Sequence, residues 1–325
     1  MGLLGRENPS MKLVMFQTVG DPRLGCQIDD RLVDLNLAYE AMLRDAGRVK
    51  ARERAAVMIP PVMEDFLAGE DEALDLARQT VDWVAGKGSA AEPLRGLDIV
   101  RPADSVKLLP PLSRPEKIIC AAVNYWDALN KRGKEPPAEP KVFSKFANSI
   151  CGWDDDVIRP TMTQALGYEV ELAVVIGRIC KNVREEDALD VLAGYMTYND
   201  ITASDLTKRD GQNTRGKGFD TFSVMGPWLV TRDEIDDPHD LDLRLSVDGR
   251  VLQDGNTRDL VYDVRRLVAF CSQVFTLRPG DVIATGSPLG LATDYDPPAF
   301  LEPGNVMETE VVGLGVCRNR IVQEA

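Results

Sequence analysis

The sequence has little of what most hydrolytic sites use, because its 325 residues include a single histidine. That residue, His239, lies in the acidic segment DEIDDPHDLD, where we expect an exposed, structural side chain. With one imidazole, Ser-His and Cys-His hydrolases and histidine-rich zinc sites are nearly excluded. A Walker sequence and a strand-linked GxGxxG are also missing, so the sequence does not favour nucleotide binding.

Signals for membrane insertion and disulfides are absent as well. No run approaches the roughly 18 apolar residues that cross a bilayer, and the first residues lack the apolar core of a signal peptide. The six cysteines lie far apart, without zinc-type pairs or the density of a disulfide scaffold. We therefore expect reduced thiols and a cytoplasmic protein.

Positive charge is scarce, since 38 Lys and Arg face 52 Asp and Glu and give a net charge of −14. Such a chain repels phosphate backbones and anionic lipids, so neither nucleic acid nor a membrane is an expected partner. An apolar fraction of 44% is ordinary for a folded protein. A small-molecule partner is the better expectation.

The chain divides into two parts at a proline-rich connector. Residues 1–106 predict a small α+β module, with short strands followed by helical periodicity from about Ala38 to Ala85. The prolines of RPADSVKLLPPLSRPEKI then favour an extended linker. Residues 107–325 form the second predicted domain.

Strand signals dominate this second part. Alternating apolar residues in LDLRLSV lead to a hairpin turn at Asp248-Gly249. We expect one helix after Asn182, with Glu185 completing a capping box, and one along the apolar stripe from Leu260 to Cys271. LRPGDVIAT and LEPGNVMET echo each other as Pro-Gly turns that feed strands. A rolled or barrel-like mixed β fold is the expected result.

Three acids are the first candidates for chemistry. Glu169 and Glu171 stand two apart in the apolar strand GYEVELAVVIG, which places both carboxylates on one face. Asp200 ends the run AGYMTYND. Three carboxylates without His or Cys suit a hard cation, Mg²⁺ first and Mn²⁺ or Ca²⁺ next. From spacing alone, the solvated face of an edge strand is an equal alternative.

Lys217 is the second candidate, in the glycine-containing loop RDGQNTRGKGFDTFSVMGPW. A lysine beside a metal can bind a substrate carboxylate or enolate oxygen. An ordinary surface lysine is the alternative. The segment TGSPLG, residues 285–290, either offers a hydroxyl and amides to an anion or is a plain turn.

Several segments in chain order resemble the fumarylacetoacetate hydrolase family, from about Lys107 to the C-terminus. They are KIICAAVNY, PKVFSKFANSI, GYEVELAVVIGR, AGYMTYNDITASD, DGQNTRGKGFDTFSVMGPW, LRPGDVIATGSPLG and LEPGNVMETEVVGLGVCRN. The resemblance implies an α+β, mainly β fold with a mixed β-roll catalytic domain. It also implies a homodimer and a short N-terminal module of the kind that many bacterial members carry.

The resemblance further implies a divalent metal, Mg²⁺ or Mn²⁺ with Ca²⁺ as a substitute in crystals, held by Glu169, Glu171 and Asp200. The implied substrate is a 2-oxo or β-diketo acid from the catabolism of aromatic or sugar-acid compounds. The implied substrate contacts are Lys217, Thr285 near a substrate carboxylate, Lys145 near the pocket entrance, and Tyr125, Ser204 and Gln212.

Two departures from the family stand out. The family's lid, Asn-Tyr-x-x-His-x-x-Glu, carries a His-Glu pair that activates water, but here the matching positions are Ala128 and Lys131. In ITASDLT, Ser204 and Thr207 stand where Arg and Gln are common. The metal platform is thus present while the usual water-activating pair is missing.

Three functions remain open. The first is a hydrolase of C–C bonds in ketonic substrates that recruits Asp127 or Glu135 as its base. The second is a decarboxylase, tautomerase, isomerase or lyase that works through a metal-bound enolate without activated water. The third is a ligand-binding protein without turnover, which the retention of the three acids and Lys217 disfavours.

Overall fold

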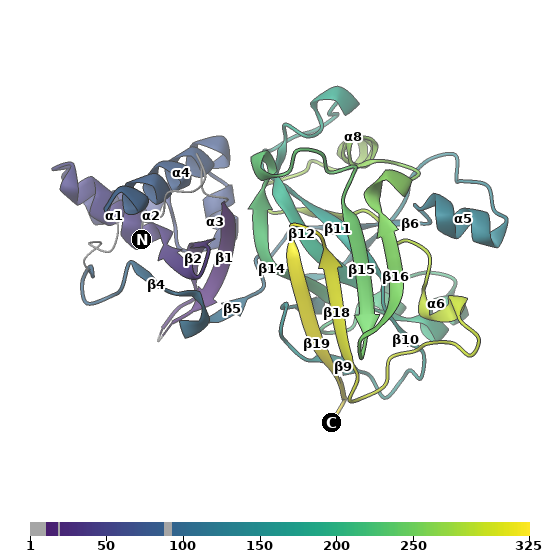
Figure 1. Cartoon of the computed structure of the whole chain (residues 1–325). Helices are drawn as coiled ribbons and strands as arrows, with labels where there is room; N and C mark the ends of the chain where they lie inside the picture. Colours follow the sequence, from purple (N-terminus) through teal and green to yellow (C-terminus); the bar gives the residue numbers. More distant parts are fainter. Residues whose placement is uncertain (1–10, 19, 88–92) are drawn as a thin grey trace.

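The computed structural model describes residues 11–18, 20–87 and 93–325. Figure 1 shows a small N-terminal part, in purple and blue, beside a larger part that holds most of the strands. The predicted fold class, α+β and mainly β, is confirmed, because mixed sheets with few helices make up the larger part.

The N-terminal part is the predicted α+β module. Its elements are β1 (Lys12–Gln17), β2 (Arg23–Ile28), β3 (Arg31–Asp34), α1 (Leu35–Asp45), α2 (Ala51–Met58), α3 (Met63–Leu67), α4 (Glu70–Lys87), β4 (Val100–Pro102) and β5 (Lys107–Leu109). Asp34 caps α1 by accepting from the backbone N–H of Leu37 at 3.0 Å. The predicted helical region is present as four helices, and Pro60 and Pro61 fall in the break between α2 and α3.

One twelve-stranded sheet runs through both parts of the molecule. Beyond β1 to β5 it contains β6 (Ile118–Ala122), β7 (Lys141–Lys145), β8 (Ile150–Cys151), β11 (Val170–Ile176), β12 (Leu192–Asp200), β14 (Ser223–Thr231) and β17 (Val282–Ala284). Its main path is β4-β3-β2-β1-β14-β12-β11-β17-β6-β7. The N-terminal strands join through the antiparallel β1–β14 pair, and β5, which follows the predicted boundary at residue 106, pairs with β1.

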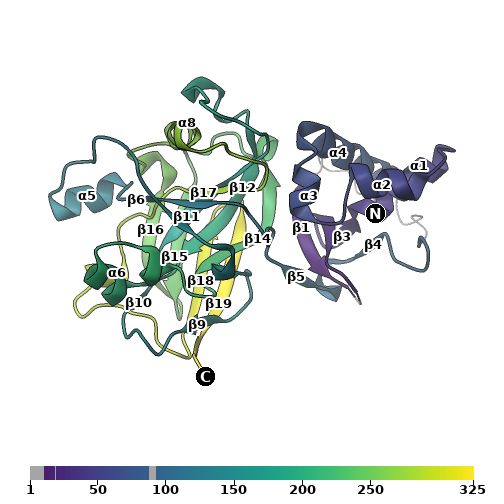
Figure 2. The same cartoon turned by 180° about the vertical axis from the view of Figure 1, so that it is seen from behind.

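A second, five-stranded sheet faces the first in the larger part. It has the order β16-β15-β18-β19-β9, with bounds β9 (Val157–Arg159), β15 (Asp242–Val247), β16 (Arg250–Asn256), β18 (Val306–Val311) and β19 (Gly315–Gln323). The predicted hairpin at Asp248-Gly249 joins β15 and β16, as expected. Figure 2 shows from behind how β18 and β19 cross over the strands of the large sheet.

Short elements complete the larger part of the molecule, which corresponds to the predicted catalytic part, residues 107–325. They are α5 (Trp126–Arg132), β10 (Leu166–Gly167), β13 (Thr202–Ala203), α6 (Ser204–Asp210), α7 (Thr214–Lys217) and α8 (Val264–Val274). The predicted apolar stripe forms the buried face of α8, which begins after its cap Asp263, so Leu260 precedes the helix. Both Pro-Gly echoes are turns with a positive φ at the glycine, +88° at Gly280 and +99° at Gly304.

The helix expected after Asn182 is absent from the described residues, where only a 3₁₀ turn over Glu185–Asp187 forms. Asn182 has a φ of +53°, which is incompatible with the extended backbone of an N-cap residue. Its backbone N–H donates instead to the carbonyl of Ser272 in α8. The capping-box prediction was therefore wrong at this position.

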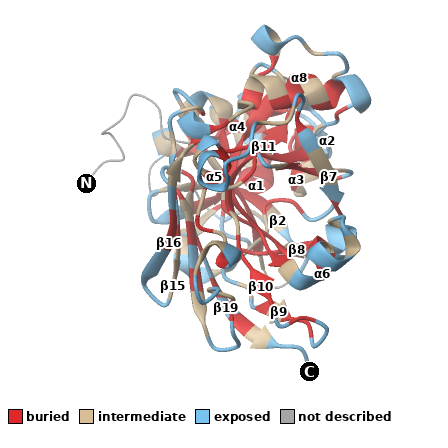
Figure 3. Ribbon diagram, turned by 90° about the vertical axis from the view of Figure 1, so that its right-hand side faces the viewer, coloured by how far each residue is buried: buried red, intermediate tan, exposed pale blue. Residues whose placement is uncertain are grey.

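The large sheet is buried on both faces, as Figure 3 shows by the red strands at its centre. On β11, Leu172, Val174 and Ile176 pack toward the second sheet and α8. Ala173 and Val175 pack on the other face with residues of the N-terminal helices. This explains the continuous apolar run of the strand.

Within the described residues, no helix is both long and apolar enough to cross a membrane.

Candidate active site

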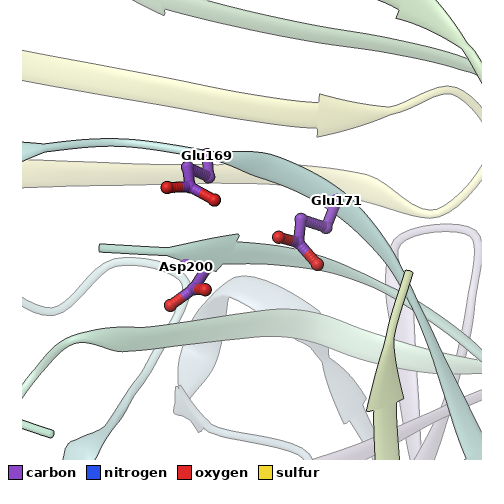
Figure 4. A group of neighbouring side chains, drawn as sticks. All are labelled: Glu169, Glu171 and Asp200. Atoms are coloured by element: carbon purple, nitrogen blue, oxygen red, sulfur yellow. The ribbon is translucent and has the colours of Figure 1, made fainter. Parts of the chain in front are cut away.

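The three predicted acids lie together at one end of the large sheet. Glu169 directly precedes β11, Glu171 lies on it, and Asp200 is the last residue of the neighbouring β12. One carboxylate oxygen of each lies within 4.8 Å of the other two, and Figure 4 shows the three side chains converging. The backbone N–H of Asp200 donates to the carbonyl of Glu169 at 2.9 Å, which fixes the register that brings them together.

Lys217 is buried beside these acids. Its Nζ donates to Asp200 Oδ2 at 2.6 Å, to the Thr202 hydroxyl at 2.7 Å and to Glu169 Oε1 at 3.1 Å. The glycine at position 216 lets α7 pack closely against α6, since a Cβ there would lie 2.9 Å from the backbone nitrogen of Thr207 in α6. The surface-loop alternative for Lys217 is therefore wrong.

The resemblance implied that Lys145 lies near the pocket entrance, but the structure places this residue elsewhere. It is 3% exposed, and its Nζ donates to Asp200 Oδ1 and to the carbonyl of Phe222, both at 2.5 Å. The reason is that β7 pairs with β6 and directs this side chain under Asp200. Lys145 is thus a buried partner of the acid cluster.

The two lysines set the charge state of the cluster. Burial alone would raise the pKa of Asp200, but the ammonium groups of Lys145 and Lys217 outweigh it and lower that pKa. Burial alone would lower the pKa of Lys217, but Asp200 and Glu169 raise it. Asp200 is therefore a carboxylate and Lys217 an ammonium at neutral pH.

The two glutamates differ from Asp200, because burial raises the pKa of each. Glu171, with Asp200 and Glu169 close by, has a pKa well above the usual value. Its Oε2 accepts from the backbone N–H of Gly286 at 2.8 Å, while its Oε1 is buried without a hydrogen-bond partner among the described residues. A buried, unpartnered acceptor costs free energy unless another group completes it.

These donors fit a hard divalent cation. Carboxylate oxygens are the ligands that Mg²⁺ and Mn²⁺ prefer, and the unpartnered Oε1 of Glu171 points to a missing positive partner. Neither His nor Cys is within the cluster. Lys217 and Lys145 would stay beside the ion as charge-balancing partners.

A cavity of about 550 Å³ opens beside the acids. Its walls come from β6, α5, the α6–α7 segment and the loop after β17, and include Glu169, Thr202 and Lys217. Two predicted substrate contacts, Ser204 and Gln212, line it. This cavity, lined by Glu169 and Lys217, is the candidate substrate site.

Two other predicted contacts lie behind the cavity wall. Thr285 is fully buried, and its hydroxyl donates to the carbonyl of Leu172 at 3.0 Å. Tyr125 is also fully buried and its ring packs in the core; its hydroxyl has no partner in the described part of the chain. Neither lines the cavity.

The segment that the resemblance matches to the family's lid forms helix α5. Ala128, which stands at the position expected for the lid His, lines the cavity. Asp127 Oδ1 accepts from the backbone N–H of Ala128, and Oδ2 accepts from that of Leu289. Both carboxylate oxygens are therefore engaged. Glu135 and Lys131 are exposed and lie outside the cavity wall.

Two contributors were missed from sequence. Thr202, two residues after Asp200, bonds both Lys217 and Glu169. Gly286, in the segment TGSPLG, uses its backbone N–H on Glu171 instead of on an external anion. The polar run NDITASD carried a signal for Thr202, whereas nothing in the sequence pairs Gly286 with Glu171.

Comparisons with known proteins agree with this site. The model of the family described as fumarylacetoacetate (FAA) hydrolase C-terminal matches residues 117–322. The mitochondrial oxaloacetate tautomerase of Xenopus laevis is 37% identical over 319 residues, covering 96% of this chain and 91% of that protein. A human mitochondrial oxaloacetate tautomerase is 39% identical over 266 residues, 81% of each chain.

A solved relative shows a ligated form of the same fold. The maleylpyruvate hydrolase of Sphingobium sp. SYK-6, in complex with manganese(II) and pyruvate, aligns with a TM-score of 0.71 and 28% identity. The alignment covers 97% of this chain and all of the other. With the family match over most of the catalytic part, the chain belongs to the fumarylacetoacetate hydrolase family.

Proposed function

We propose that this protein is a divalent-metal-dependent tautomerase of a 2-oxo dicarboxylic acid of the oxaloacetate kind. The observation that carries the proposal is the cavity itself, which pairs the acid cluster and Lys217 with Ala128 at the place of the family's lid His. Hydrolysis needs a base aimed at a water molecule, whereas a keto–enol shift needs no attacking water, only a group that takes the enol O–H proton and a group that delivers a proton to the adjacent carbon.

The candidate bases of the hydrolase hypothesis have other surroundings. Asp127 spends both oxygens on backbone N–H groups, and Glu135 is exposed outside the cavity. The names of the curated relatives support the tautomerase alternative over the hydrolase. We therefore rank the enolate reaction first.

Each group has a defined task in this proposal. Glu169, Glu171 and Asp200 would hold Mg²⁺ or Mn²⁺. When bound, such an ion withdraws electrons from a chelated 2-oxo acid and stabilises its enolate. Lys217, whose raised pKa keeps it protonated, would release one of its three present acceptors, Asp200, Thr202 or Glu169, to donate from Nζ to the substrate oxygen that becomes negative.

The cavity also favours a substrate with a second negative group. Lys208 and Arg132 line it in addition to Lys217. Arg132 is paired with Asp294 at 3.0 Å, whereas Lys208 has no ion pair within the described ranges. Lys208 is therefore the cation that we propose for a distal carboxylate.

The homodimer and the cytoplasmic location stay part of the proposal. All six cysteines are free thiols and burial raises the pKa of each, which fits a reducing compartment. Light scattering of the purified chain would test the dimer.

The test follows conversion of enol-oxaloacetate to its keto form, with Mg²⁺, with Mn²⁺ and with a chelator. In parallel, cleavage of an acylpyruvate and release of CO₂ from oxaloacetate are measured. We expect metal-dependent tautomerisation, with cleavage slower by roughly 10²-fold or more because a positioned base contributes about that much. Acylpyruvate cleavage as fast as tautomerisation would refute the proposal.

A further inference from the structure

Helix α5 is attached at both ends to one loop, residues 286–294. At its N-terminal end, Asp127 Oδ2 accepts from the backbone N–H of Leu289 at 3.0 Å. At its C-terminal end, Arg132 Nη2 donates to both carboxylate oxygens of Asp294, at 3.0 and 3.1 Å. The helix is thus fixed at two points about one and a half turns apart.

The loop that receives these contacts is itself fixed to the acid cluster. Asp294 Oδ2 accepts from the backbone N–H groups of Gly290 and Leu291 at 3.2 and 3.0 Å. At the other end of the loop, the N–H of Gly286 donates to Glu171. A chain of direct contacts therefore runs from Glu171 through the loop to both ends of α5.

The segment that follows α5 is anchored as well. Gly133 ends the helix with a φ of +59°, and the chain then runs to Pro137, whose carbonyl accepts from the Tyr262 hydroxyl. Asn124, which lies between β6 and the helix, exchanges two hydrogen bonds with the backbone of Tyr262, each at 2.9 Å. Figure 1 and Figure 2 both place α5 on the side of the catalytic part away from the N-terminal module.

We propose that Asp127 and Arg132 are positioning residues that latch α5 over the cavity before substrate binds. Neither reaches the reacting atoms, because both act through the loop of residues 286–294. The latch places Ala128, a small apolar residue that is 7% exposed, in the cavity wall. In this chain the lid closes the site without supplying a base.

This inference rests on the proposed function, to which it gives a physical reason. A wall without a base, held in one position, gives the cavity a fixed shape around an enolate without directing a base at water. Asp127, a candidate base from sequence, thereby has a structural role.

Hydrogen exchange on the full chain, measured without substrate, tests the latch. Asp127→Asn keeps one acceptor oxygen for two backbone donors, and Arg132→Gln removes the ion pair to Asp294. Lys131→Gln is the matched control, because this neighbouring cation on α5 is exposed and has no ion pair in the part of the chain that is described.

We expect the amides of residues 126–132 to exchange roughly threefold faster in Arg132→Gln, as for a partly exposed ion pair. In Asp127→Asn the increase should be about tenfold, as for the loss of a charged hydrogen bond. Arg132→Lys should restore most of the protection. The β15–β16 hairpin should exchange as in the parent, which verifies the fold.

Asp127→Asn alone separates a latch from a catalytic role, because Arg132 itself lines the cavity. Its KM for oxaloacetate should rise while kcat stays within about twofold, because opening lowers the binding-competent fraction alone. The double variant, which combines Asp127→Asn with Arg132→Gln, serves the exchange measurement. Unchanged exchange in α5 of the double variant, or an equal increase in Lys131→Gln, would overturn the latch. If the parent showed no tautomerase activity, the proposed function would fail while the exchange result still judged the latch.

Discussion

Glu171 carries the strain of the site at the scale of single residues. It is a fully buried carboxylate with one oxygen bonded to Gly286 and the other without a partner in the described chain. Because its pKa is raised, ionising it costs the metal-free protein stability at neutral pH. A bound cation would remove this cost.

Glu171→Gln should therefore abolish tight Mg²⁺ or Mn²⁺ binding and raise the free energy of unfolding of the chelator-treated protein by about 1 kcal/mol or more, seen as a higher melting temperature. The sign with pH follows from the raised pKa. The folded state holds the Glu171 proton more tightly than the unfolded state, so the penalty is complete above the folded pKa, declines as pH falls below it and is gone below the unfolded pKa. The stability gain of the variant should shrink accordingly. Calorimetry and thermal melts from pH 8 to lower pH measure both effects; a variant that still binds metal like the parent would contradict the site.

Lys217→Met should spare metal binding and damage turnover. An ammonium cannot ligate a cation, but its donors lie 2.6 Å from Asp200 and face the cavity. Loss of such a donor costs about 10² in kcat or more. Titration calorimetry with Mn²⁺ and the tautomer assay check the two halves, with Lys131→Met as the matched surface control. A loss of metal affinity equal to that of Glu171→Gln would count against the substrate role.

At this scale the sequence predicts the acids better than their partners. Period-two spacing is a local property of a strand, so Glu169 and Glu171 could be placed on one face in advance. Lys145 could not be placed, because its contact with Asp200 depends on the pairing of β7 with β6. Thr285 was expected at a substrate but donates to a neighbouring strand, for the same reason.

At the scale of elements, helix α5 is the part of the cavity wall on which the proposed reaction depends. Four residues of the lid motif have different surroundings. The ring of Tyr125 is buried, and the carboxylate of Asp127 accepts backbone hydrogen bonds. Ala128 lines the cavity, and the ammonium group of Lys131 is exposed. Rebuilding the motif therefore tests whether the missing pair alone prevents hydrolysis.

The double change Ala128→His with Lys131→Glu should leave acylpyruvate cleavage within about threefold of the parent, below the 10²-fold that a positioned base would add. The His would enter a tight wall, and the Glu at 131 would face solvent while the latch holds. Metal affinity should be unchanged. Product analysis with Mn²⁺ measures cleavage, and a gain near 10²-fold would show that this chain is a disarmed hydrolase.

Local patterns predicted most elements that depend on neighbours in sequence. The β15–β16 hairpin and α8 agree with their apolar periodicity. The capping box at Asn182 failed because a tertiary bond to Ser272 holds that residue at a positive φ. At this position a tertiary hydrogen bond to α8 forms in place of the predicted helix cap.

The N-terminal module and the catalytic part share one sheet at the scale of the whole molecule. Phe66 and Val81 of the module pack with Ala173, Val175 and Met196 of the central strands. Tyr198, in the same cluster, lies beneath Lys145 with its ring centre 6.0 Å from Nζ. The prediction of two domains from a proline-rich connector describes the chain order but missed this shared core, because strand partners cannot be read from local sequence.

We therefore expect one cooperative unfolding transition in scanning calorimetry. A chain truncated to residues 107–325 should be insoluble, because the apolar outer face of the sheet would lose its cover. Addition of Mn²⁺ should shift the single transition of the full chain upward as one unit. Two separate transitions, or a soluble truncated chain with parental metal affinity, would contradict the shared core.

The pairing of β1 with β14 also sets the order of events during synthesis. The backbone N–H of Met11 donates to Glu234, a contact that spans 223 positions of the chain. Contacts between residues so far apart in sequence slow folding, because the chain loses the entropy of loop closure before the contact contributes favourable free energy. On the ribosome, the first strand made must therefore wait for one of the later strands, and the N-terminal module leaves the exit tunnel with an unpaired edge that a chaperone or a neighbouring chain can occupy first.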